Sequence, residues 1–138
     1  MTEIFVFGSN LQGIHKRGAA LSALQNHGAV LGIGNGIQGF SYAIPTKETP
    51  YRSLSLQEIN VYVAEFILFA ANNPEYTFNL TKVGCGMAGY SAETIAPLFY
   101  LVKTLWNVKI PADFVDHIPG MKEKVAEYPN LIAEFDGF

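Results

Sequence analysis

The sequence contains one cysteine and no long apolar run, and each shortage excludes a class of protein. Cys85 cannot form an internal disulfide, and no paired Cys/His spacing typical of a structural zinc site is present. No stretch approaches the roughly 20 apolar residues of a membrane span, and the N-terminus lacks the basic start and long apolar run of a signal peptide. We expect a cytoplasmic protein that is neither secreted nor embedded in a membrane, with no metal and no cofactor.

Charge is also scarce. Charged residues make up 15% and apolar residues 49% of the 138 residues, and the formal net charge is -3. The apolar content excludes disorder, and the length predicts one domain over residues 1–138. The nine Lys and Arg are scattered and form no basic stripe, so we do not expect nucleic acid as a partner.

Strands and helices alternate along the first half of the chain. Residues 4–7 form a wholly apolar run, which is typical of a strand buried on both faces. Apolar spacing predicts a helix over 18–27 with Gly28 as its C-cap, whereas residues 32–39 are too rich in glycine for regular structure. A second strand is then predicted over 40–44, stopped by Pro45.

The second half repeats this order. Ser55 and Glu58 fit a capping box at the start of a helix that the run 72–74 ends, and residues 77–83 predict a third strand. A glycine-rich loop over 84–90 precedes a helix capped by Ser91. Beyond it, either 108–110 or 113–115 supplies one more strand, and 121–128 predicts a short solvent-facing helix. The alternation predicts a single three-layer α/β domain with a mostly parallel sheet.

Ligands of such sheets bind at the carboxyl edge of the strands, where both glycine-rich loops should lie. The second loop is a formal G-x-G-x-x-G of residues Gly84, Cys85, Gly86, Met87, Ala88 and Gly89, followed by Tyr90. It follows a predicted strand and opens a predicted helix, which is the setting in which glycines bring backbone N–H groups against a phosphate. No acidic residue lies about 20 positions further on, so we retain phosphate binding and reject a nicotinamide-dependent dehydrogenase.

The same glycine pattern occurs at 34–39, but there it precedes a strand. Its geometry is therefore wrong for the fingerprint, and a flexible connector explains this segment equally well.

The first loop combines small residues with polar groups and two cations beside a helix start. Its candidate ligand contacts are Gly8, Ser9, Asn10, Gly13, Lys16, Arg17, Gly18 and Ala19. Lys16 and Arg17 suit a diphosphate or else point to water as solvated turn residues, and Asn10 contacts the ligand or caps a turn. Thr46 and Lys47 are expected just past a strand end, where Lys47 either reaches an anionic ligand or is solvated.

Three side chains have both a chemical and a structural interpretation. His15 is either a general acid or base or a polar surface residue. Cys85 precedes a helix N-terminus and is either a nucleophile or a small residue that fills the loop. Tyr90 either stacks on a base or ribose or seals the loop to the next helix.

Taken together, the two loops resemble the macro domain family and its phage and bacterial relatives over roughly residues 4–105. The residues that carry the resemblance are Gly8-Ser9-Asn10, Gly13, Gly18-Ala19-Ala20, the run 83–90, Glu93 and Ala96. The resemblance implies that Asn10 lies near the distal ribose of ADP-ribose, residues 13–19 near the phosphates, and residues 84–90 around the diphosphate. Two departures stand out: the adenine-recognising Asp of the family has no counterpart before the first strand, and His15-Lys16-Arg17 replace a plain glycine run.

We therefore expect a small nucleotide-like ligand, either ADP-ribose or a related nucleotide diphosphate. Hydrolysis of ADP-ribosyl derivatives, with Asn10 and His15 positioning the ribose and a water, is one extension of this prediction. A non-catalytic sensor or interaction module of phage or bacterial origin is the alternative, and a hydrolase that uses Cys85 is a third. Aromatic residues on the predicted helices are expected in the core or in a homo-oligomeric interface; these are Phe66, Phe69, Phe99, Tyr100 and Trp106.

Overall fold

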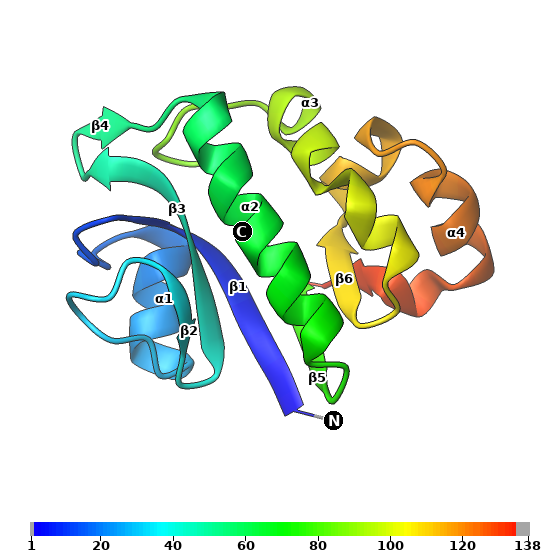
Figure 1. Cartoon of the computed structure of the whole chain (residues 1–138), viewed down its shortest axis with the longest axis horizontal. Helices are drawn as coiled ribbons and strands as arrows, with labels where there is room; N and C mark the ends of the chain where they lie inside the picture. The colour runs from blue at the N-terminus through cyan, green and yellow to red at the C-terminus, as the bar shows by residue number, and fades with distance from the viewer. Residues whose placement is uncertain (1, 135–138) are drawn as a thin grey trace.

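A seven-stranded mixed sheet separates two layers of helices in the computed structural model, which describes residues 2–134 (Figure 1). The strands are β1 (Thr2–Asn10), β2 (Gly36–Gln38), β3 (Ser41–Thr49), β4 (Arg52–Ser53), β5 (Tyr76–Leu80), β6 (Val108–Pro111) and β7 (Ile132–Ala133). The α-helices are α1 (Gly18–Asn26), α2 (Leu56–Asn72), α3 (Ala92–Ile95) and α4 (Met121–Glu127), and the 3-10 helices are η1 (Ala96–Thr104), η2 (Ala112–His117) and η3 (Pro129–Leu131).

The sheet has the order β2-β3-β1-β5-β6-β7, with β4 paired to β3. Every pairing is parallel except those of β3 with β2 and with β4. The mostly parallel α/β fold predicted from the sequence is therefore confirmed. Strand β1 lies at the centre between β3 and β5, which explains why residues 4–7 are buried on both faces.

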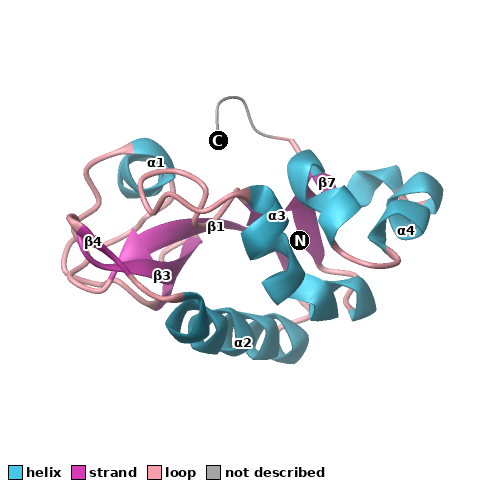
Figure 2. Cartoon of the chain, turned by 90° about the horizontal axis from the view of Figure 1, so that it is seen from above, coloured by secondary structure: helices cyan, strands magenta, loops and turns pink. Residues whose placement is uncertain are grey.

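Alternate residues of β1 face two different cores. Phe5 and Phe7 pack with Ala23 of α1, whereas Ile4 and Val6 belong to the larger core on the opposite face. The larger core also contains side chains of α2, α3 and η1. Figure 2 shows α1 above the sheet and α2 below it, so the three predicted layers are present.

The predicted ends of α2 are confirmed, and α1 ends one residue earlier than predicted, with His27 as its C-cap and Gly28 one position beyond. The Ser55 hydroxyl accepts a hydrogen bond from the Glu58 N–H at 3.2 Å, and the Glu58 carboxylate accepts one from the Ser55 N–H at 3.2 Å. This capping box starts α2, and the helix ends at Asn72. Gly28 follows α1 with a φ of +74°, the left-handed conformation that a C-terminal glycine adopts at low cost.

Two predictions around Pro45 are wrong. Residues 36–38 of the glycine-rich segment form β2, and β3 continues through Pro45 to Thr49. On one side of β3, β2 pairs only with residues 41–43 and β4 only with residues 47 and 49. Around position 45, therefore, β1 alone borders β3, and the missing N–H of Pro45 is tolerated there. Thr46 and Lys47 consequently lie within a strand and not in a turn after it.

The second half of the chain follows the prediction with several changes. Strand β5 ends at Leu80, three residues earlier than expected, and the helix capped by Ser91 is four α-helical residues followed by η1, with non-helical dihedrals at Phe99. Of the two alternatives for a late strand, 108–110 is realised in β6, whereas 113–115 belongs to η2. The short helix α4 is present but does not only face solvent, because Met121 and Val125 are buried in the larger core. None of the helices described for residues 2–134 combines the length and apolar character needed to cross a bilayer.

Candidate functional site

A cleft of about 760 Å³ lies where β1, β3 and β5 reach their carboxyl ends. Its size falls within the range of small-molecule and cofactor sites. Three chain segments line it. They are the end of β1 with the loop into α1, the end of β3 with the turn into β4, and the loop after β5.

Most of the residues predicted to bind a ligand meet in this cleft. Those that line it are Gly8, Ser9, Asn10, Lys16, Arg17, Gly18, Ala19, Thr46, Lys47, Gly84, Cys85, Gly86, Met87 and Ala88. Gly13, His15, Gly89 and Tyr90 were also predicted, but they are not among the lining residues. Sequence reasoning missed Pro50, Tyr51, Thr81 and Lys82, and it did not single out Gln12, Ile14, Ala20 and Val83 as contacts, although Ile14 lies in the range 13–19 expected near the phosphates.

The cleft is electropositive although the chain carries a net charge of -3. Lys16, Arg17, Lys47 and Lys82 line it, and no described Asp or Glu does. Among the described residues, Lys82 is the one of these four cations that is in an ion pair, 3.4 Å from Asp113, whose carboxylate is well exposed. Four of the nine Lys and Arg therefore surround one cavity, an arrangement that favours an anionic ligand.

The N-terminus of α1 adds backbone donors to the same cavity. Arg17 occupies the N-cap position without a side-chain cap, and the first helical residues, Gly18 and Ala19, line the cleft. The first N–H groups of a helix have no partner within the helix, and the helix dipole places partial positive charge there. This end of α1 is thus suited to a phosphate or carboxylate.

The second glycine-rich loop is closed by its own backbone. Gly89 donates to the Gly86 carbonyl at 3.0 Å, and Tyr90 donates to the Gly84 carbonyl at 3.0 Å. The Ser53 hydroxyl of β4 donates to the Ala88 carbonyl at 2.8 Å. A Cβ built on Gly86 would meet nothing within 4 Å, so the cleft is open at this position.

The Asn10 side chain organises the first loop. Its Nδ2 donates to the Ile14 carbonyl at 2.9 Å, and its Oδ1 accepts from the Ile14 N–H at 3.0 Å. One N–H and one lone pair of the amide remain for other partners. Asn10 therefore both closes the turn and lines the cleft, which combines the two interpretations of the sequence.

His15 lies behind the cleft and not in it. Its ring is 1% exposed and packs edge-on against Phe7, with ring centroids 5.2 Å apart. Nε2 lies 3.1 Å from the Val30 carbonyl and 3.0 Å from the Ile33 carbonyl. Because carbonyls only accept, Nε2 carries the proton in this arrangement. The position gives His15 a structural role in joining two loops, and it lends no support to the predicted acid–base role.

The glycine-rich segment before β3 packs against the back of the first loop. A Cβ on Gly34 would overlap the Asn10 carbonyl, and one on Gly13 would overlap the backbone of Gly32 and Ile33. The Ser9 hydroxyl also donates to the Gly34 carbonyl. Gly13 and Gly34 thus permit close contact between two backbones. For Gly13 this role differs from the ligand contact that was predicted. The segment 32–39 therefore does more than connect α1 to β3.

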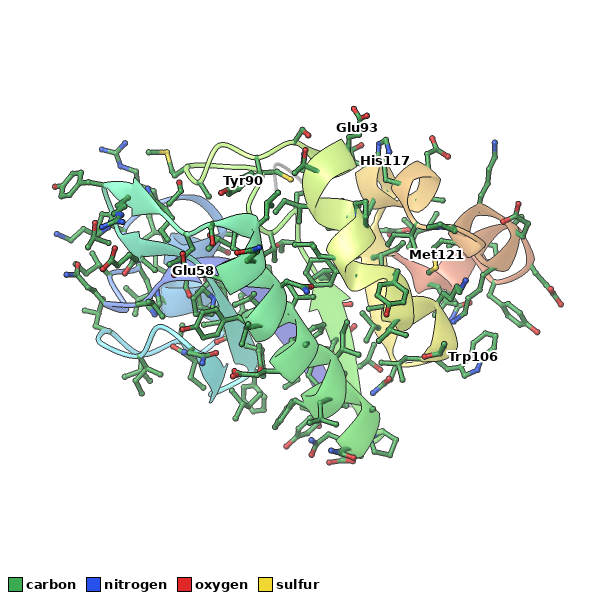
Figure 3. All side chains as sticks on the ribbon, turned by 45° about the horizontal axis from the view of Figure 1, so that its top comes forward. Glu58, Tyr90, Glu93, Trp106, His117 and Met121 are labelled. Carbon is green, nitrogen blue, oxygen red and sulfur yellow. The ribbon has the colours of Figure 1, made fainter. Side chains whose placement is uncertain are left out.

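Tyr90 packs as the structural interpretation of the sequence expected. It is half-buried against the larger core, and its hydroxyl donates to the Leu54 carbonyl at 2.5 Å. In Figure 3 it lies at the second loop, near the upper middle of the view, whereas Trp106 lies at the lower right. Tyr90 therefore seals the loop to the body of the domain.

Cys85 lines the cleft as a protonated thiol. Burial, which outweighs the opposing effect of Lys82, raises its pKa, and Asp113 raises it further. The Sγ lies 3.7 Å from the Val83 carbonyl. An activated nucleophile needs a lowered pKa, so this environment favours the loop-filling role.

Comparison of the chain with protein-family models, with curated proteins and with solved structures found no match. Within residues 2–134, no three His, Cys, Asp or Glu side chains are grouped so that they could hold a metal ion.

Proposed function

We propose that this protein binds ADP-ribose or a related nucleotide diphosphate in the cleft at the carboxyl edge of the sheet. The observation that carries the proposal is the convergence of Lys16, Arg17, Lys47 and Lys82 with the N-terminus of α1 on one cavity. A diphosphate offers two anionic groups to such a set of donors. The cavity of about 760 Å³ has room for the attached sugars and base.

The resemblance to macro domains agrees with this assignment. In that family an Asn follows a buried strand, and a later glycine-rich loop wraps the diphosphate. Here Asn10 ends the central strand β1 and residues 84–88 line the same cleft, as the resemblance implies. Membership of the family is part of the proposal.

Binding without turnover is the form of the proposal that we favour. The titratable groups lining the cleft are the four cations, the protonated Cys85 thiol and Tyr51, so the described residues offer no carboxylate or imidazole as a general base. This charge pattern supports the non-catalytic nucleotide sensor over the ADP-ribosyl hydrolase. Incubation of the wild-type protein with ADP-ribosylated protein substrates tests this choice, and release of ADP-ribose would reverse it.

Calorimetric titration with ADP-ribose tests the ligand, with AMP and pyrophosphate as controls. We expect ADP-ribose and pyrophosphate to bind, and a higher salt concentration to weaken both, because exposed charges are screened. Gly86→Glu should lower ADP-ribose affinity by more than about tenfold, because a carboxylate in the cleft repels the diphosphate. Gly86→Gln is the matched control of equal size, and it should lose less affinity.

We expect the fold to tolerate these substitutions, because a Cβ at position 86 would meet nothing within 4 Å apart from its own chain neighbours. Equal losses for Gly86→Glu and Gly86→Gln would show that bulk and not charge matters there. Absence of binding by ADP-ribose, AMP and pyrophosphate to the wild-type protein would refute the ligand assignment.

A further inference from the structure

Tyr51 is a rim residue of the cleft whose side chain is almost fully exposed. It lies in the turn between β3 and β4, lines the cleft, and is 96% exposed, the highest value among the large apolar side chains described. At this exposure the ring has almost no protein packed against it. Truncating it should therefore leave the folded domain nearly unchanged.

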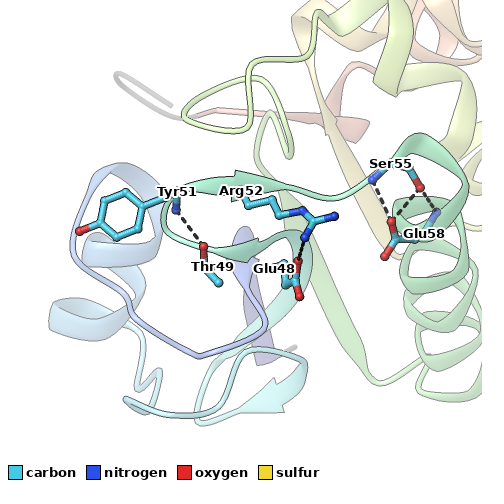
Figure 4. Close-up of polar contacts among 6 residues, drawn as sticks. All are labelled: Glu48, Thr49, Tyr51, Arg52, Ser55 and Glu58. Atoms are coloured by element: carbon cyan, nitrogen blue, oxygen red, sulfur yellow. Dashed lines mark hydrogen bonds and ion pairs between the residues drawn. The ribbon is translucent and has the colours of Figure 1, made fainter.

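The backbone around Tyr51 is nevertheless held in place. The Lys47 ammonium donates to the Pro50 carbonyl, and the Tyr51 N–H donates to Thr49 Oγ1 at 3.1 Å. Glu48 and Arg52 form an ion pair at 3.2 Å across the hairpin. Figure 4 shows the Tyr51 ring projecting from the tip of this hairpin, away from that ion pair.

The hairpin is also joined to the other side of the cleft. Ser53, two residues after Tyr51, donates to the Ala88 carbonyl of the second glycine-rich loop at 2.8 Å. Because strand β3, the hairpin and that loop are tied together, the backbone that carries the ring has a defined place relative to the cations. An unpacked flat ring held beside an anion site is suited to stacking on a planar group of the ligand.

We infer that Tyr51 stacks on the nucleobase of the bound ligand, so that this residue distinguishes nucleotides from phosphates that lack a base. The inference rests on the proposed function, since it needs a diphosphate held by the four cations. Stacking does not read the hydrogen-bonding edges of a base, and every base has a flat face. Tyr51 should thus confer a preference for aromatic bases with little choice among them.

The test compares ADP, GDP, UDP and pyrophosphate by calorimetric titration of the wild-type chain, Tyr51→Ala, Tyr51→Phe and Tyr51→Leu. Loss of a stacked ring weakens binding between about fivefold and 150-fold. We expect Tyr51→Ala and Tyr51→Leu to lose affinity for all three nucleotides within this range, and Tyr51→Phe to retain it. Pyrophosphate should bind all four proteins equally.

Tyr100→Ala is the matched control, because Tyr100 is an exposed tyrosine of η1 that does not line the cleft. It should bind every ligand as the wild-type chain does. Equal nucleotide affinity in the wild-type chain and Tyr51→Ala would overturn the inference and leave the proposed function intact. The same holds if Tyr51→Ala loses as much affinity for pyrophosphate as for the nucleotides. Failure of the wild-type chain to bind any of the four ligands or ADP-ribose would instead overturn both.

Discussion

Replacing His15 by alanine separates a structural histidine from a catalytic one. The ring fills a space beside Phe7 and joins the first loop to the segment before β2 through the carbonyls of Val30 and Ile33. A catalytic role would predict lost turnover in a protein of normal stability. The structure predicts lost stability instead.

The magnitude follows from what each carbonyl retains. Without His15, the Val30 carbonyl still accepts from the Ile33 N–H at 3.2 Å, and the Ile33 carbonyl still accepts from Gln38 Nε2 at 3.0 Å. Neither carbonyl is left without a donor, so the lost hydrogen bonding costs about 1 kcal/mol. The void left beside Phe7 adds about 2 kcal/mol, for a total loss of about 3 kcal/mol in the free energy of unfolding.

Urea unfolding followed by circular dichroism measures this loss directly. At about 4 °C per kcal/mol, the melting temperature should fall by roughly 12 °C. The control is His117→Ala, a half-exposed histidine at the end of η2, which should change stability by less than about 0.5 kcal/mol. Wild-type stability in His15→Ala would refute the structural role, and so would an equal loss in the control.

Three further predictions follow from the packing of single residues. Gly34→Ala should destabilise the protein by about 3 kcal/mol or more, because the new Cβ overlaps the Asn10 carbonyl. Gly86→Ala is the control and should change stability by less than about 1 kcal/mol. Similar melting temperatures for the two variants would contradict this prediction. Burial raises the pKa of Cys85, so a thiol reagent at pH 7.5 should modify it more slowly than in the urea-unfolded chain, and equal rates would show an accessible, reactive thiol. Burial, and then the charge of Glu65, raise the pKa of Tyr42 to about 12, so the folded protein retains a proton that the unfolded chain releases above about pH 10. Stability should therefore be fully present below pH 10 and fall by about 1.4 kcal/mol per pH unit between pH 10 and 12, and a Tyr42→Phe variant with the same pH dependence as the wild-type chain would refute the assignment.

Much of the candidate site could be predicted because it depends on strand ends. In a parallel sheet every strand ends at the same edge, so the loops after β1 and β5 had to lie near one another. Asn10, Lys16, Arg17 and residues 84–88 were found in this way and line the cleft. Lys82 is the second residue after β5 and satisfies the same rule, but the strand was predicted to extend past it.

Side-chain direction could not be predicted. Lys16 and His15 are neighbours in one loop, yet Lys16 faces the cleft and His15 is buried against Phe7. Tyr51 was missed because Pro45 was expected to end β3, which left no hairpin to carry an aromatic residue to the rim. The only local signal for Tyr51 was a proline–tyrosine pair between two strand-like segments, which many surface turns contain.

The sequence by itself determined the fold class, the ends of α2 and the edge at which the cleft opens. These properties depend on apolar periodicity, capping residues and chain direction, all of which act over a few residues. Only the tertiary structure decided that β3 passes through Pro45, that the glycines at 13 and 34 pack backbone against backbone, and that four scattered cations meet in one cavity. Each of these features depends on contacts between segments distant in the chain, which a local pattern does not encode.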